Sequence, residues 1–377
     1  MTPKEPSLTF GIEEEYHLVD IKTRELRQAP QALMDACENA LGDQVSPEFF
    51  RSQIEIGTRV LTNFTDARTE LGRLRKTIAE TCLKFGVAPI AASTHPFAKK
   101  HNLQTTPKER YQILARDFGG VGRRLAICGM HVHAGIEDPE MRIDLMNQAR
   151  YFLPHFLMLS TSSPMWEGDD TGLRSYRLAI FHGLPRTGLP QRFSSYDEFM
   201  RTVSVLINNG IIEDASKVWW DLRPSTRFPT LEMRITDVTP RMEDALAIAA
   251  LYVCVLRMLY RRRTQNLSWR AYPAFLIEEN RWRAQRYAVS DRLFDFGEGE
   301  LVAFSNLVDE LIELVAEDAE ALGCTSEVAH TRKIAREGTS ADRQIATLQA
   351  RLEAGDTLID AQKAVVDLLI SETISGV

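Results

Sequence analysis

Glu13 and Glu15 lie two residues apart in residues 8–18, a segment in which apolar and polar side chains alternate. Successive side chains of a β-strand point to opposite faces, so both carboxylates share one face of a predicted strand. At an effective dielectric near 20, two such charges about 4 Å apart repel by roughly 4 kcal/mol. The pair is therefore stable only if it is solvated, protonated or bridged by a cation. This segment alone fits a divalent-metal site and an ordinary sheet with one wet face equally well.

A second predicted strand, residues 48–56, repeats the alternation and adds further polar groups. Arg51 and Glu55 share one face of it, while the other face is apolar. Glu48 has the wrong parity for that polar face. It could join Glu55 only through a bulge or from the preceding loop.

Two later strands add imidazoles, another acid and another arginine. His131 and His133 alternate with apolar residues in one strand, and Glu232 and Arg234 do so in the other. A single strand of this kind usually has one solvated face. Four such strands together favour a concave, carboxylate-rich site.

Oxygen ligands combined with imidazole suit Mg²⁺ or Mn²⁺ better than a structural zinc site. Three arginines, Arg51, Arg223 and Arg234, would compensate the negative charge and bind phosphate or carboxylate oxygens. No Gly-x-x-x-x-Gly-Lys-Ser/Thr loop is present, so phosphate binding would rely on metals and arginines.

Composition places the chain among globular proteins and narrows its partners. It has 377 residues, of which 44% are hydrophobic and 26% charged, enough for a substantial core. The formal net charge of -7 gives no overall attraction for a nucleic acid, although 35 Arg against 10 Lys suit small anionic substrates. The longest apolar run, residues 245–256, is too short to span a bilayer. Five widely spaced cysteines and the absence of a signal peptide predict a cytoplasmic protein without disulfides.

The order of segments predicts an α+β protein in which residues 1–377 form a single domain. Strand-like and helix-like segments alternate up to about residue 239, and the remainder is predicted to be helical. Residues 160–192 are rich in Gly, Pro, Ser and Arg and are predicted to form a long loop region. The helical C-terminal half makes a homo-oligomer plausible, with a dimer favoured.

Several sequence motifs, in their order and spacing, resemble those of the glutamate–cysteine ligase type 2 group, the YbdK-like carboxylate–amine ligases. The resemblance covers nearly the whole chain. The motifs that carry it are Gly11-Ile12-Glu13-Glu14-Glu15, Gly129-Met130-His131-Val132-His133, Arg174-Ser175-Tyr176-Arg177, Trp219-Trp220-Asp221-Leu222-Arg223 and Leu231-Glu232-Met233-Arg234.

The resemblance implies a glutamine-synthetase-like catalytic fold, with a curved, mainly antiparallel sheet and helices packed on one side. It also implies ATP bound through Mg²⁺ or Mn²⁺ and amide formation through an acyl phosphate, with L-glutamate (through its γ-carboxylate) and L-cysteine as substrates. Arg234 and Arg51 are then expected to act in catalysis, and Arg223, Arg177 and Tyr176 in substrate binding. The implied metal ligands are Glu13, Glu15, Glu55, His131 and Glu232.

Other functions remain compatible with these residues. His131-x-His133 has the spacing of a zinc pair, so a metal-dependent hydrolase is one alternative, with His155, His182 or His330 as further ligands. A phosphotransferase related to guanidino kinases is another. A third is a metal or nucleotide binder without catalytic activity.

Overall fold

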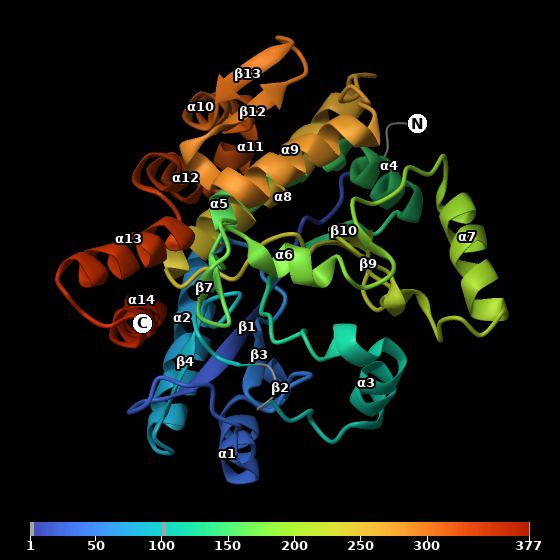
Figure 1. Cartoon of the computed structure of the whole chain (residues 1–377). Helices are drawn as coiled ribbons and strands as arrows, with labels where there is room; N and C mark the ends of the chain where they lie inside the picture. Colours follow the sequence, from blue (N-terminus) through green and yellow to red (C-terminus); the bar gives the residue numbers. More distant parts are fainter. Residues whose placement is uncertain (1–3, 100–102, 377) are drawn as a thin grey trace.

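The computed structural model describes residues 4–99 and 103–376, and its centre is a seven-stranded sheet (Figure 1). The strand order is β10-β11-β5-β1-β3-β2, and β4 pairs with β1 as well. Every pairing in this sheet is antiparallel. The strands are β1 Phe10–Asp20, β2 Val45–Pro47, β3 Gln53–Gly57, β4 Val87–Ile90, β5 Met130–Gly135, β10 Leu222–Pro224 and β11 Thr230–Met233.

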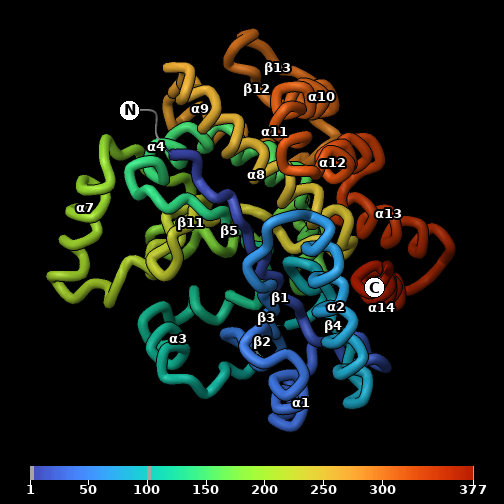
Figure 2. Tube along the Cα trace, turned by 180° about the vertical axis from the view of Figure 1, so that it is seen from behind, coloured from blue at the N-terminus to red at the C-terminus, as the bar shows by residue number. Residues whose placement is uncertain are grey.

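Helices cover the apolar face of this sheet. Ile12, Tyr16 and Leu18 of β1 are buried there in one core with residues of α2, α4 and α8. Figure 2 shows α2 and α8 over the strands from behind. The helices that contribute to this core include α1 Gln31–Leu41, α2 Phe64–Leu83, α4 Pro139–Ala149 and α8 Met242–Thr264. The predicted α+β class, with a mainly antiparallel sheet and helices on its apolar face, is confirmed.

One ion pair lies inside that core. Glu14 has the apolar parity of β1, and its Oε1 is 2.6 Å from Nη2 of Arg75 in α2. Arg75 also donates to the carbonyl oxygens of Thr239, at 3.0 Å, and of Pro240. The charged pair is therefore satisfied, and it fixes β1, α2 and the segment that leads into α8 relative to one another.

The C-terminal region is largely helical, as predicted, and its helices α10, α12, α13 and α14 lie on the opposite side of the molecule from α3 Glu109–Gly122 and α7 Tyr196–Asn208 (Figure 1). The part of the chain beyond residue 239 is not entirely helical as predicted, because a hairpin, β12 Arg292–Asp295 and β13 Glu300–Ala303, lies between α9 and α10. The helices are α9 Ala274–Tyr287, α10 Phe304–Leu314, α11 Ala316–Ala321, α12 Thr325–Glu337, α13 Ser340–Glu353 and α14 Leu358–Thr373.

Two further predictions need correction. Residues 48–56 are not one strand: β2 and β3 form a hairpin, and the chain turns between them. The region 160–192 is not entirely loop, since α6 Tyr176–Phe181 forms within it. The remaining elements are α3 Glu109–Gly122, α5 Leu153–Ser160, α7 Tyr196–Asn208, β6 Met165–Trp166, β7 Asp169–Asp170, β8 Thr187–Gly188 and β9 Trp219–Trp220.

Within the described part of the chain, no helix combines the length and apolarity needed to cross a bilayer.

Candidate active site

The register of the central strands brings the predicted site residues side by side. Glu15 of β1 lies opposite Glu55 of β3, and Glu13 lies opposite His131 of β5. Side chains directly opposite one another on adjacent antiparallel strands have Cβ atoms about 4.5–5.5 Å apart. Acidic and imidazole groups from three distant segments therefore form one row on the polar face.

The same row continues toward the edge of the sheet. His133 of β5 lies opposite Glu232 of β11, and Glu232 lies opposite Arg223 of β10. The row runs across the floor of a cavity of about 610 Å³. Its lining includes seven acidic residues, Glu13, Glu15, Glu48, Glu55, Glu213, Asp214 and Glu232.

One group of ligand atoms, here called the Glu15 cluster, comprises Glu15, Glu48 and Glu55. One carboxylate oxygen from each lies within 4.8 Å of the others. Burial, followed by the charge of Glu48, raises the pKa of Glu15 to about 8. Burial and the charges of Glu48 and Glu13 likewise raise the pKa of Glu55 well above its usual value. Three carboxylates this close ionise together only if a cation compensates their charge.

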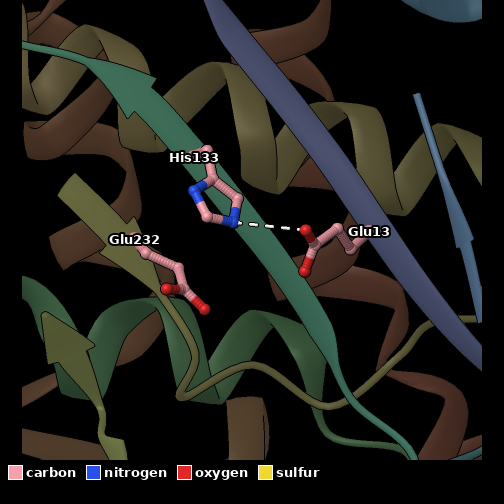
Figure 3. Close-up of side chains that lie close together, drawn as sticks. All are labelled: Glu13, His133 and Glu232. Atoms are coloured by element: carbon pink, nitrogen blue, oxygen red, sulfur yellow. Dashed lines mark ion pairs between the residues drawn. The ribbon is translucent and has the colours of Figure 1, made fainter. Parts of the chain in front are cut away.

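A second group, the His133 cluster, comprises Glu13, His133 and Glu232 (Figure 3). Nε2 of His133 is 3.4 Å from Oε1 of Glu13, and its Nδ1 is 2.9 Å from the hydroxyl of Thr230. Burial opposes ionisation of Glu13, but its hydrogen bonds to His131 and His133 prevail and hold its pKa well below the usual value. Both carboxylates and the imidazole face a common point, as Figure 3 shows.

His131 lies between the two clusters. Its Nδ1 is 3.3 Å from Glu13 and its Nε2 is 4.0 Å from Glu15. Burial, with the charge of Arg234, lowers the pKa of His131 to about 4, so its imidazole is neutral near pH 7. The buried Nε2 has no hydrogen-bond partner among the residues that the structure describes. A neutral imidazole with an unused buried nitrogen is suited to bind a metal ion.

Two arginines hold the carboxylate of Glu232. Nε of Arg223 donates to it at 2.8 Å, and Nη1 of Arg234 donates to its other oxygen. Burial raises the pKa of Glu232, but the charges of Arg234 and Arg223 outweigh burial and lower it strongly. Arg223 also donates to the carbonyl oxygens of Ser216 and Val218, each at 2.8 Å. Most donors of Arg223 are thus used inside the protein, and its guanidinium orients Glu232.

Arg177, near the start of α6, lies beside Gly129, the residue that precedes β5. Its Nη1 and Nη2 donate to the carbonyl oxygens of Ile235, at 3.3 Å, and Arg234, at 3.2 Å. A Cβ atom at Gly129 would collide with this guanidinium, which explains the glycine. Nearby, the backbone N–H of Gly129 donates to Glu15 at 2.7 Å.

Two predicted site residues do not line the cavity. Arg51 lies in the turn before β3, where its Nη2 donates to the carbonyl oxygen of Ala29 at 3.1 Å. The hydroxyl of Tyr176 accepts a hydrogen bond from Arg124 at 3.3 Å. The catalytic role expected for Arg51 depended on a single strand over residues 48–56, and the turn removes that basis.

Glu48 and His133, whose places the sequence left open, both belong to the site. Glu48 directly follows β2, so it reaches Glu55 from the neighbouring strand's end and its parity relative to β3 is irrelevant. The sequence analysis did not single out Arg110, Lys217 or Arg227, which add positive charge to the lining. No alternation marks these three, since they lie on a helix, a short turn and a loop.

The further imidazoles that a zinc hydrolase would need lie elsewhere. His155 is buried among aromatic rings, 5.6 Å from that of Tyr151, and His330 is 2.8 Å from Asp244. His182 packs against Gly188. None of these three histidines lines the cavity.

Comparison with known proteins finds relatives that align along nearly the whole chain. The profile of the glutamate–cysteine ligase family 2 matches residues 9–361. A relative from Rhodospirillum rubrum is 55% identical over 377 residues, covering 99% of this chain and 97% of the relative. A relative from Jannaschia is 56% identical over 364 residues, covering 97% of this chain and 96% of the relative. Both carry the provisional name glutamate–cysteine ligase 2.

Solved structures share the fold at low sequence identity. A glutamate–cysteine ligase from Francisella tularensis, crystallised with AMP, aligns with a TM-score of 0.67 and 13% identity, covering 100% of this chain and 91% of that one. A bifunctional glutathione synthetase from Pasteurella multocida aligns with a TM-score of 0.69 and 14% identity, covering 98% of this chain and 53% of that one.

The fold, the site and these relatives together define an ATP-dependent carboxylate–amine ligase. The chain belongs to the glutamate–cysteine ligase family 2.

Proposed function

We propose that this enzyme joins the γ-carboxylate of L-glutamate to the amine of L-cysteine and releases ADP and phosphate. The observation that carries the proposal is the pair of ligand clusters that line one cavity, together with Arg234, which lines the same cavity and donates to Glu232. The names of the relatives support the choice of glutamate and cysteine.

The residues present fit two divalent cations. The Glu15 cluster offers three carboxylates, and the His133 cluster offers two carboxylates and an imidazole. The raised pKa values of Glu15 and Glu55 and the unused Nε2 of His131 are consistent with groups that await a cation. Hard oxygen donors favour Mg²⁺ or Mn²⁺. Such ions, when bound, neutralise charge on the β- and γ-phosphates of ATP during phosphoryl transfer.

The protein's own groups have distinct tasks in this reaction. A carboxylate is a poor electrophile, and phosphorylation by ATP turns one of its oxygens into a leaving group for attack by the amine. Arg234 presents a guanidinium beside Glu232 and stabilises negative charge on the transferred phosphoryl group. Arg223 keeps Glu232 ionised and oriented. Arg177 and Arg223 remain proposed contacts for the amino-acid carboxylate, and Arg110, Lys217 and Arg227 add attraction for anionic substrates at the lining.

An ADP-release assay tests reaction class and substrates together. The purified chain is supplied with ATP, Mg²⁺ or Mn²⁺ and pairs of amino acids, and mass spectrometry identifies the product. We expect γ-glutamylcysteine with equimolar ADP and phosphate. A different amide would correct the substrates but leave the ligase reaction in place. Stable phosphorylated product without an amide, or metal-dependent hydrolysis indifferent to ATP, would overturn the proposal.

The expected cytoplasmic location agrees with a requirement for ATP, and it stays a prediction.

A further inference from the structure

A second hollow, of about 320 Å³, adjoins the catalytic cavity at the loop 225–229, which joins β10 to β11. Four consecutive residues of this loop, Ser225 to Phe228, line both hollows. Side chains of α4 and α7 complete the second one, among them Arg142 and Tyr196. Its volume is in the range of small-molecule sites.

Arg142 is a buried cation that has no acid partner among the residues that the structure describes. It is 8% exposed, and its buried Nε makes no hydrogen bond within residues 4–99 and 103–376. Its guanidinium lies over the ring of Tyr196, 5.7 Å from the ring centroid. A guanidinium cannot lose its proton in a protein, so an unpaired buried one is unfavourable.

The buried Arg75 shows how another arginine of this chain is satisfied. Arg75 meets the carboxylate of Glu14 and two backbone carbonyl groups. Arg142 faces a hollow instead, so the anion that pairs with it can come from solution. An anion at this place would meet a planar guanidinium, which binds a carboxylate through two parallel hydrogen bonds.

The rest of the lining determines which kind of anion fits the hollow. Phe199 and Met200 of α7, Pro224 of β10, and Phe228 and Pro229 of the loop are apolar. Ser225, Thr226 and Arg227 also line the hollow, but the apolar walls would replace only part of the hydration of a hydrophilic dianion such as phosphate. We propose that the second hollow binds a small monocarboxylate with an aromatic or aliphatic body, its carboxylate on Arg142 and its body against Phe199 and Phe228.

The site is connected to the His133 cluster through the shared loop. The ring of Phe228 stands edge-on to the imidazole of His133, with 6.1 Å between centroids. Thr230, at the end of the loop, contacts Nδ1 of His133 at 2.9 Å. A ligand that packs against Phe228 holds this loop in place, and it thereby changes how firmly His133 is oriented toward Glu13.

Binding is measured by titration calorimetry on the full chain without ATP or metal, so the result is independent of the proposed ligase activity. The probes are 3-phenylpropionate, its uncharged amide, and inorganic phosphate. We expect the carboxylate to bind at least tenfold more tightly than the amide or phosphate. In Arg142→Met its affinity falls at least tenfold, whereas Arg201→Met, an exposed arginine on α7, leaves it unchanged.

Equal affinities for carboxylate and amide, preference for phosphate, or wild-type affinity in Arg142→Met would overturn the site. The comparison of acid with amide uses the wild-type chain, so it decides the matter even if Arg142→Met does not fold. For the connection to His133, Mn²⁺ is titrated with and without saturating 3-phenylpropionate. A change in Mn²⁺ affinity of at least threefold is expected, and an unchanged affinity would refute the coupling.

Discussion

At the scale of single residues, the site is defined by carboxylates whose ionisation conflicts with burial. In the Glu15 cluster, the pKa of Glu15 is raised to about 8, while the Glu232 carboxylate is kept ionised by two arginines. Both clusters place negative ligand groups inside the protein, but their charge is compensated in different ways. One depends on an added cation, and the other is partly compensated within the chain.

Substitution of a ligand tests the clusters directly. Glu55→Gln and Glu232→Gln each remove one charge while keeping the shape of the side chain. We expect metal-dependent ADP release to fall at least roughly 100-fold in both, because a ligand matters at least as much as the groups that orient it. Circular dichroism should show an unchanged fold.

Glu353→Gln, at an exposed position on α13, is the matched control and should keep wild-type turnover. Wild-type turnover in both ligand variants would remove the basis of the ligand assignment.

The raised pKa of Glu15 also predicts a pH-dependent stability. Its usual value is 4.5 and its folded value about 8, so the folded metal-free protein holds this proton more tightly than the unfolded chain does. The contribution of Glu15 to stability is thus present below pH 4.5 and is lost as the pH rises through about 8. Glu15→Gln should raise the free energy of unfolding at pH 7.5 by about 1–3 kcal/mol without metal.

Urea titrations between pH 5 and pH 8.5, with chelator present, measure this difference. The wild type should lose stability across that interval more steeply than the variant, and Mn²⁺ should stabilise the wild type more. A parallel pH profile for the two proteins would contradict the raised pKa.

At the scale of elements, the polar row depends on the register of β1, β3, β5 and β11, and the Glu14–Arg75 pair fixes β1 against α2. Arg75→Met leaves Glu14 buried without its partner. We expect a loss of about 3–5 kcal/mol in the free energy of unfolding, measured by chemical denaturation.

Arg73→Met, on the exposed side of the same helix, removes a pair with Glu70 at 3.0 Å and should cost at most about 1 kcal/mol. The double variant Arg75→Met/Glu14→Leu should recover part of the loss, since neither charge is then left buried. Similar small losses for Arg75→Met and Arg73→Met would show that the buried pair is not essential for the register.

At the scale of the whole molecule, one apolar core joins the sheet to the helices from α8 to α12, with residues from Leu8 to Ala335. A second apolar cluster joins β4 to α13 and α14. We therefore propose that the chain unfolds as one domain, in a single calorimetric transition whose van't Hoff and calorimetric enthalpies agree. Two resolved transitions would indicate separate units. The expected homodimer stays a prediction, which light scattering coupled to size-exclusion chromatography can test.

The sequence by itself determined the class of the fold, the family and the core of the site. Alternation in β1, β5 and β11 identified Glu13, Glu15, His131 and Glu232, because a period of two assigns each side chain to a face without knowledge of neighbouring strands. Residues 245–256, the longest apolar run of the sequence, are buried in α8.

Only the tertiary structure decided which residues meet. Because the chain turns between β2 and β3, Glu48 belongs to the Glu15 cluster although it lies beyond the end of β2, and Arg51 lies outside the site. Parity is a property of one strand, and it carries no information across a turn. The sequence pattern does not reveal the neighbours of Arg142 either, because its unpaired charge arises from the packing of α4 against α7 and the loop 225–229.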